Sequence, residues 1–232
     1  MSATRIEDVF KVTGVPTYTF VGPSEYNHLQ VALRTPGRGV VVEGPSGIGK
    51  STAVEKALED IGLDPDVTKL SARVPADVEY LDMLGELGDF GTIVIDDFHR
   101  LDAATKARIA DLLKVTADTE DPLRKLVIIG INEAGSALIE SAPDLANRID
   151  VIRFETEPAN KIDELVLAGE IAANLSIEAR TLISEKASGT NRMTRRFPSP
   201  EKTVNMPNTS GMRWKTRPRS ILRRCGAASD AR

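Results

Sequence analysis

The sequence contains few of the residues that cross-link a protein or anchor it in a membrane. It has one cysteine, Cys225, so neither an internal disulfide nor a CxxC zinc site can form within the chain. Its two histidines, His28 and His99, are far apart and have no third ligand nearby, which argues against a histidine metal site. The longest apolar runs, such as 126–131, are too short to cross a bilayer, and the acidic start does not look like a secretory signal. We therefore expect a cytoplasmic protein with no membrane association.

Charge is divided unevenly along the chain, although the net charge is only −4. Residues 190–232 hold 11 Lys and Arg against 2 Asp and Glu, a net charge of +9, whereas the residues before them carry −13. An acidic body argues against broad nonspecific nucleic-acid binding by the globular part. We expect most of the tail to be disordered. Three interpretations stay open: a basic arm for nucleic acid or an acidic partner, a tail without function, or a shifted reading frame.

From residue 39 onward, short apolar runs alternate with amphipathic helical patterns. The runs predict strands at 40–43, 67–70, 92–96, 125–131 and 150–154, and the patterns between them predict helices at 51–62, 75–88 and 102–116. Several runs are nearly continuous Val and Ile, as expected for strands covered on both faces. This alternation predicts a mostly parallel, three-layer α/β domain with right-handed crossovers. After Phe154 the patterns are helical only, at 157–175 and 176–189, which predicts a small helical subdomain.

One loop carries a specific chemical pattern. Residues 44–51, GPSGIGKS, match G-x-x-x-x-G-K-[ST] in full and stand between a predicted strand and a predicted helix. Glycines there let successive backbone N–H groups approach phosphate oxygens, and the helix directs its positive end at the same anion. We expect Lys50 to reach the β- and γ-phosphates of a nucleotide and Ser51 to ligate Mg²⁺. The predicted nucleotide-binding residues are Gly44, Pro45, Ser46, Gly47, Ile48, Gly49, Lys50, Ser51 and Thr52.

An acid pair follows a later strand. The run 92–96 ends in Asp96, and Asp97 comes directly after it. We expect Asp96 to hold Mg²⁺ through water, together with Ser51, and Asp97 to orient or deprotonate an attacking water. An acidic turn after a strand would have the same sequence in isolation. The run 92–96 is the third predicted strand when the strand before the phosphate loop is counted as the first. In that position the acid pair is a second indication of a nucleotide site.

Two further residues have a functional and a structural interpretation of similar weight. Asn132 follows a buried strand, so its amide either faces the crevice at the carboxyl ends of the strands or caps the helix that starts near 134. Arg148 lies near the end of a short helix before the last strand. It either reaches the γ-phosphate bound to a neighbouring subunit or completes the electrostatics of its own helix end.

Together these segments resemble the P-loop ATPases of the AAA+ and STAND group over roughly residues 25–189. GPSGIGKS is similar to Walker A, IVIDD to Walker B, the strand ending in Asn132 to the sensor 1 strand, and Arg148 to an arginine finger. The resemblance implies a three-layer P-loop NTPase fold with a five-stranded parallel sheet of order 5-1-4-3-2, followed by a partial α-helical lid. Where AAA+ proteins usually have Glu after the Walker B Asp, this chain has Asp97, as in STAND ATPases.

The resemblance also implies a domain organisation and an activity. We expect an N-terminal segment at 1–24, an ATPase core at 25–156, a truncated lid at 157–189 and the basic tail at 190–232. ATP and Mg²⁺ are the expected ligands, with a homo-oligomer formed through Arg148 and an unidentified protein partner. GTP is disfavoured because the chain has no N/T-K-x-D motif after a strand. The expected activity is ATP hydrolysis, with a nucleotide-dependent interaction module or a DNA-associated ATPase as alternatives.

Overall fold

The computed structural model describes residues 5–11, 16–131, 133–177, 183 and 214–216. Of these, residues 22–158 form one compact unit, and the described residues outside that range belong to a second unit. The division at 24, 156 and 189 expected from the sequence stays a prediction.

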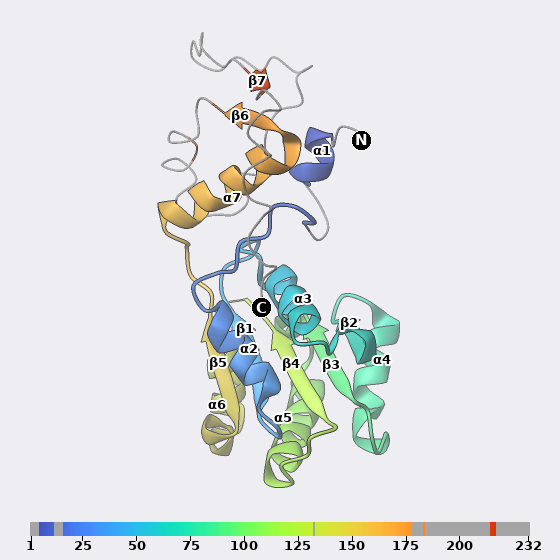
Figure 1. Cartoon of the computed structure of the whole chain (residues 1–232). Coiled ribbons are helices and arrows are strands. Elements are labelled where there is room, and N and C mark those ends of the chain that lie inside the picture. The colour runs from blue at the N-terminus through green and yellow to red at the C-terminus, as the bar shows by residue number, and fades with distance from the viewer. Residues whose placement is uncertain (1–4, 12–15, 132, 178–182, 184–213, 217–232) are drawn as a thin grey trace, which may run out of the picture. The chain divides into compact units, whose positions relative to one another are not determined.

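The first unit is built on a five-stranded parallel sheet with the order β2-β3-β4-β1-β5 (Figure 1). This order is the predicted 5-1-4-3-2 read from the opposite edge, so the expected fold class is confirmed. The strands are β1 (Gly39–Glu43), β2 (Val67–Ser71), β3 (Thr92–Asp96), β4 (Lys125–Ile129) and β5 (Ile149–Arg153). All five residues of β1 and of β4 are buried. The phosphate loop therefore follows one of the two most enclosed strands.

Helices cover both faces of this sheet, as Figure 1 shows. Val40 and Val42 of β1 pack in the core cluster of α2 (Tyr26–Arg34) and α3 (Lys50–Asp60). Val41 points to the other face and packs in a second cluster. That second cluster contains residues of α4 (Pro75–Met83), α5 (Ala103–Asp118) and α6 (Ala134–Ser141). Successive side chains of this apolar strand point to opposite faces of the sheet. Helices pack on both faces, and the sheet and its two helical covers form the three layers.

The element boundaries differ from the predicted ones in a few places. The helix predicted at 75–88 ends as α4 at Met83, and a 3₁₀ turn, η2 (Leu84–Glu86), follows it. The remaining 3₁₀ segments of this unit are η1 (Asp64–Asp66), η3 (Phe98–Arg100) and η4 (Pro143–Asn147). Helix α2 was not predicted. It buries Leu29, Ala32 and Leu33 against the sheet.

The second unit contains α1 (Ile6–Val9), α7 (Ala159–Ala173), β6 (Leu175–Ile177) and β7 (Trp214–Thr216). Phe10 packs on α7 at Gly169, where an added Cβ would lie 2.0 Å from the ring. The helical prediction is wrong at 175–177, because these residues pair antiparallel with β7. Residues 178–182, 184–213 and 217–232 lie outside the described part, so the predictions for the second lid helix and most of the tail stay predictions. None of the helices described is both long and apolar enough to cross a membrane.

Candidate functional site: a phosphate loop and an acid pair

The loop predicted to bind phosphate runs from the carboxyl end of β1 to the start of α3. Gly44 has φ +148°, and a Cβ at this position would come within 2.3 Å of the Phe154 carbonyl oxygen. Gly49 is the N-cap of α3 with φ +102°, in the left-handed region that favours glycine. Between them the Ile48 side chain is buried, while Pro45, Ser46 and Gly47 are exposed. One buried side chain therefore holds the loop on the core and leaves its crest accessible.

Lys50 is the first residue of α3, and its ammonium group lies inside this loop. Its Nζ donates hydrogen bonds to the carbonyl oxygens of Gly44 and Pro45, both at 2.8 Å. Burial lowers the pKa of Lys50, and the nearby carboxylates of Asp96 and Asp97 oppose that shift. The ammonium is thus bound to neutral carbonyls of the loop itself, and a phosphate oxygen can replace those contacts without breaking an ion pair.

Ser51 and Asp96 join the loop to β3. The Ser51 hydroxyl donates a 2.7 Å hydrogen bond to Asp96 Oδ2, while the backbone N–H of Asp97 donates to Asp96 Oδ1 at 2.7 Å. A hydroxyl and a carboxylate oxygen at the mouth of a phosphate loop are the hard oxygen donors that Mg²⁺ prefers. The residues present therefore fit a magnesium ion carried in with nucleotide phosphates.

Asp97 has a left-handed backbone conformation, and its side chain is paired with an arginine from another loop. Its φ of +57° is left-handed, which sets the Asp97 side chain apart from that of Asp96. Arg73, which follows β2, contacts both oxygens: Nη2 lies 2.8 Å from Oδ1 and Nε lies 2.6 Å from Oδ2. This pair raises the pKa of Arg73. Sequence reasoning missed Arg73, although its place after the strand next to β3 is a usable signal in a parallel sheet.

The two remaining predicted site residues are Asn132 and Arg148. Asn132 lies outside the described residues, so its predicted role stays a prediction. Arg148 lies at the amino end of β5, where its carbonyl accepts from the Gly39 N–H at 3.1 Å. The five-residue strand β1 separates this end from the phosphate loop by about 16 Å. Arg148 Nε lies 2.8 Å from Asp118 Oδ1, and Nη1 donates to the Asp144 carbonyl at 2.7 Å. Arg148 therefore makes the contacts of a helix end and lies away from the loop of its own chain.

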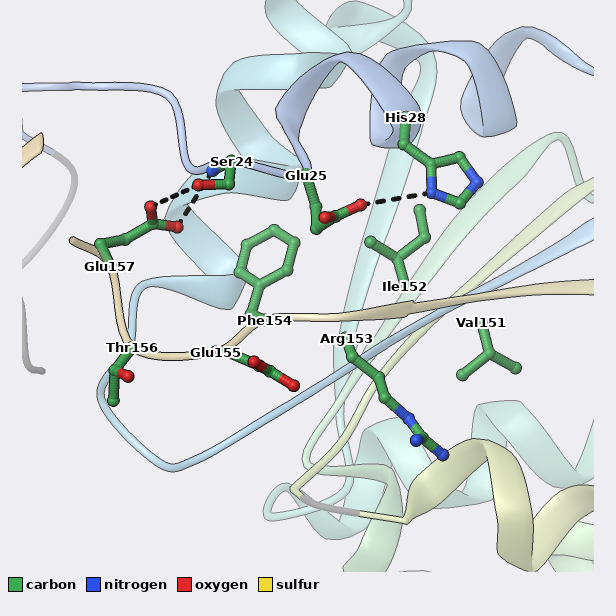
Figure 2. A pocket seen from close by; sticks show the side chains of 10 residues that line it. All are labelled: Ser24, Glu25, His28, Val151, Ile152, Arg153, Phe154, Glu155, Thr156 and Glu157. Carbon is green, nitrogen blue, oxygen red and sulfur yellow. Dashed lines mark hydrogen bonds and ion pairs between the residues drawn. The ribbon is translucent and has the colours of Figure 1, made fainter.

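A cavity of about 450 Å³ lies beside β5 and the start of α2 and includes no residue of the phosphate loop (Figure 2). Its rim contains two hydrogen bonds between Ser24 and Glu157, which the sequence analysis did not predict. The N–H and hydroxyl of Ser24 donate to the two oxygens of Glu157, at 3.0 and 2.8 Å. These hydrogen bonds join the segment after β5 to the segment before α2. Both segments lie close to the bounds of the first unit, residues 22 and 158.

The comparisons with known proteins support the fold. Domain III of the Thermotoga maritima replication initiation protein DnaA gives a TM-score of 0.56 at 16% identity, over 82% of this chain and 85% of that one. The Thermotoga maritima RuvB Holliday junction branch migration motor gives 0.56 at 20%, over 76% and 60%. The Aeropyrum pernix ORC2 protein, solved as ADPNP-ADP complexes, gives 0.54 at 14%, over 81% and 63%. No protein-family model and no curated protein matches the sequence.

These similarities, with the strand order and the loop geometry, define the class of fold. The chain has the P-loop ATPase fold of the AAA+ group, as the motifs predicted. It spans 60% of RuvB and 63% of ORC2, so those proteins contain regions that it does not match.

Proposed function

We propose that the chain binds Mg-ATP at the loop between β1 and α3 and hydrolyses it, driving a conformational switch or the remodelling of a protein partner in the cytoplasm. The observation that carries this proposal is the convergence of Lys50, Ser51, Asp96 and Asp97 at the carboxyl ends of β1 and β3. The ORC2 structure was solved with adenine nucleotides, which favours ATP as the ligand. The chain's own motifs favour ATP over GTP as well.

Each residue has a defined task in this mechanism. The backbone N–H groups of 46–49 and the amino end of α3 bind the phosphates, and Lys50 exchanges its two carbonyl contacts for phosphate oxygens. Ser51 and Asp96 hold the magnesium ion, whose charge offsets that of the phosphates. Asp97 accepts a hydrogen bond from the attacking water and orients or deprotonates it. Arg148 supplies a cation to the nucleotide of a neighbouring copy in a homo-oligomer.

One observation favours a second candidate, a nucleotide-dependent interaction module with little turnover. Both oxygens of Asp97 are bound by Arg73, so an attacking water would have to share the acid with a guanidinium already in place. Asp97 is also one methylene shorter than the Glu usual at this place in AAA+ proteins. In this candidate the nucleotide stabilises one conformation and is released unchanged, in the manner of a switch.

A DNA-associated ATPase is the third candidate, and the neighbours favour it. Two of the similar proteins are a replication initiation protein and a Holliday junction branch migration motor. The +9 charge of residues 190–232 is a plausible contact for a phosphate backbone. Deletion of 190–232 tests this candidate. Loss of DNA retention at low salt supports it, and unchanged retention removes the tail from the function.

Binding and turnover of ATP, measured together with sedimentation, separate the first two candidates. Steady phosphate release that depends on protein assembly supports the ATPase. Tight ATP binding without release above background supports the interaction module. Absence of binding by any adenine nucleotide, in a folded protein, contradicts both.

A further inference from the structure

Glu43 is a buried carboxylate beside the phosphate loop that the mechanism above does not use. It is the last residue of β1 and is 2% exposed, next to Gly44 on one side and three valines on the other. Burial of a carboxylate is unfavourable unless its oxygens are hydrogen-bonded or paired. Both Glu43 oxygens have partners, and the partners belong to two other elements.

The first partner is the amino end of α6. Glu43 Oε2 accepts a 2.8 Å hydrogen bond from the backbone N–H of Gly135. Gly135 is the second residue of α6, so this N–H has no acceptor within its own helix, and the carboxylate also complements the positive end of the helix. A Cβ on Gly135 would lie 2.8 Å from Val151 and 3.3 Å from the Glu43 oxygen. Glycine therefore allows the helix end to approach β1 and β5 this closely.

The second partner is Arg153 of β5. Arg153 pairs with Glu43 in the strand register, and its Nε lies 2.6 Å from Glu43 Oε1. The Arg153 side chain is 64% exposed, and Figure 2 shows it on the opposite side of β5 from Ile152 and Phe154. The backbone carbonyl of Glu43 also accepts from the Phe154 N–H at 2.8 Å. Glu43 is thus fixed to β5 on one side and to α6 on the other.

These contacts hold the segment between β4 and α6 at both ends. At one end the Gly130 N–H donates to the Val42 carbonyl at 3.0 Å, and at the other the Gly135 N–H donates to the Glu43 side chain. Val42 and Glu43 are consecutive and lead directly into the phosphate loop. Because β4 lies between β1 and β3, its carboxyl end lies between the strand that precedes the phosphate loop and the strand that ends in Asp96.

We propose that Glu43 is a positioning residue for ATP hydrolysis, which holds the amino end of α6 and the segment before it at a fixed place relative to the phosphate loop. The proposal rests on the ATPase function proposed above. The nucleotide is bound by the backbone of 46–49 and by Lys50, neither of which uses the Glu43 side chain. Loss of the Glu43 side chain would therefore shift the amino end of α6 relative to the loop without removing a ligand of the nucleotide, and we expect turnover to fall more than affinity.

Three variants test this proposal in the full chain. Glu43→Gln keeps an oxygen that can accept from Gly135, Glu43→Ala removes it, and Glu59→Ala, at an exposed acid of α3, is the control. The measurements are kcat and KM for ATP, the dissociation constant of a fluorescent ATP analogue, and the melting temperature. We expect Glu43→Ala to lower kcat by about 10- to 100-fold with an affinity change within about 3-fold. Glu43→Gln is expected to restore most of kcat, and Glu59→Ala to stay near wild type.

A second readout is independent of turnover. Amide hydrogen exchange in a peptide covering the start of α6 is expected to accelerate in Glu43→Ala, while a peptide covering β3 stays unchanged. Unaltered exchange at α6 overturns the positioning role even if the wild-type protein shows no ATPase activity, in which case the proposed hydrolysis fails separately. Equal losses of affinity and kcat, or an inactive Glu43→Gln that melts like wild type, also overturn it.

Discussion

The two ends of the parallel sheet both gather charged side chains, but they hold them in different ways. At the amino end, Arg38 binds both oxygens of Asp150, at 3.1 and 2.9 Å, and also contacts the carbonyls of Asn147 and Ile149. Arg148 is paired there with Asp118. At the carboxyl end, Lys50 contacts only neutral carbonyls of its own loop among its hydrogen bonds in the described structure.

This difference makes the carboxyl end the better place for an anion, as the proposed function requires, because Arg38 and Arg148 at the amino end are already paired with carboxylates. A phosphate that approaches Arg38 or Arg148 must compete with a carboxylate already in place, whereas at Lys50 it replaces two carbonyls. The carboxyl end also presents the N–H groups of the loop and the amino end of α3, which the amino end of the sheet cannot. Lys125, at the amino end, also donates to two carbonyls, so the partners of a cation do not mark a site by themselves. The backbone N–H groups beside Lys50 make the difference.

The largest expected effect is at Lys50. Lys50→Ala removes the cation that exchanges carbonyls for phosphate oxygens, and we expect the affinity for a fluorescent ATP analogue to fall by about 100-fold or more. Lys56→Ala is the matched control, because Lys56 lies on the same helix and pairs with Glu59 away from the loop. Unchanged affinity in Lys50→Ala would show that the loop does not bind the nucleotide.

Asp97 separates binding from chemistry. Asp97→Asn keeps the shape of the side chain but cannot accept a proton, so we expect turnover to fall by about 100-fold while the affinity stays within a few-fold. Phosphate release and analogue binding measure the two effects. Asp111→Asn, on the exposed face of α5, is the control. Equal turnover in wild type and Asp97→Asn removes this acid from the mechanism.

Arg148 tests whether the amino end of the sheet is only structural. If Arg148 reaches the nucleotide of a neighbouring copy, Arg148→Ala is expected to lower turnover by about 10-fold or more, but only at protein concentrations at which sedimentation shows assembly. If it serves its own helix end, the variant melts at a lower temperature and keeps its concentration-dependent turnover. Arg108→Ala, which breaks an exposed pair with Asp82, is the control.

Much of the fold could be predicted from the sequence because its strands are short, buried and continuous. The run VVV before the phosphate loop allows few alternatives to a central parallel strand, and β1 extends it by one residue at each end. Helix α2 escaped prediction because it presents only Leu29, Ala32 and Leu33 to the core within nine residues. Residues 175–177 were predicted to be helical but form a strand, and the partner of that strand, β7, lies far along the chain. Local pattern cannot reveal such a partner.

The distinction between a local pattern and a distant partner also applies to the functional and charged residues at the two ends of the sheet. Lys50 and Ser51 belong to a local motif, and Asp96 ends a strand whose place in the sheet follows from the fold, so all three were predicted. Arg73, Glu43 and Lys125 were not, because each is defined by a partner 24, 92 or 93 residues away. Their residue types have many ordinary uses on a protein surface. Only the three-dimensional structure shows which partner each of these side chains contacts.

A substitution at Lys125 is expected to change stability only, without an effect on ATP binding or turnover, and it tests how the amino end of the sheet holds charge. Its Nζ is buried and donates to the carbonyls of Ala32 and Thr35, both at 2.7 Å, at the end of α2. Burial lowers the pKa of Lys125 to about 8, with Asp150 opposing the shift and Arg38 adding to it. A neutral amine still has two N–H groups for these two carbonyls, so deprotonation keeps both hydrogen bonds.

The sign of the pH effect follows from the unfolded state, in which Lys125 titrates near 10.5. Between pH 8 and 10.5 the unfolded chain binds more protons than the folded one at this residue, so its contribution to the free energy of unfolding rises with pH and is flat below pH 8. Lys125→Met cannot titrate, and we expect wild type to gain about 2 kcal/mol relative to it between pH 7.5 and 9.5 in urea unfolding. Tyr26, whose pKa is raised by burial, is present in both proteins and cancels in the difference. Parallel stability curves across this range would mean that the α2 end is bound by an ammonium ion at every pH measured, and that the amino end retains its charge instead of releasing it.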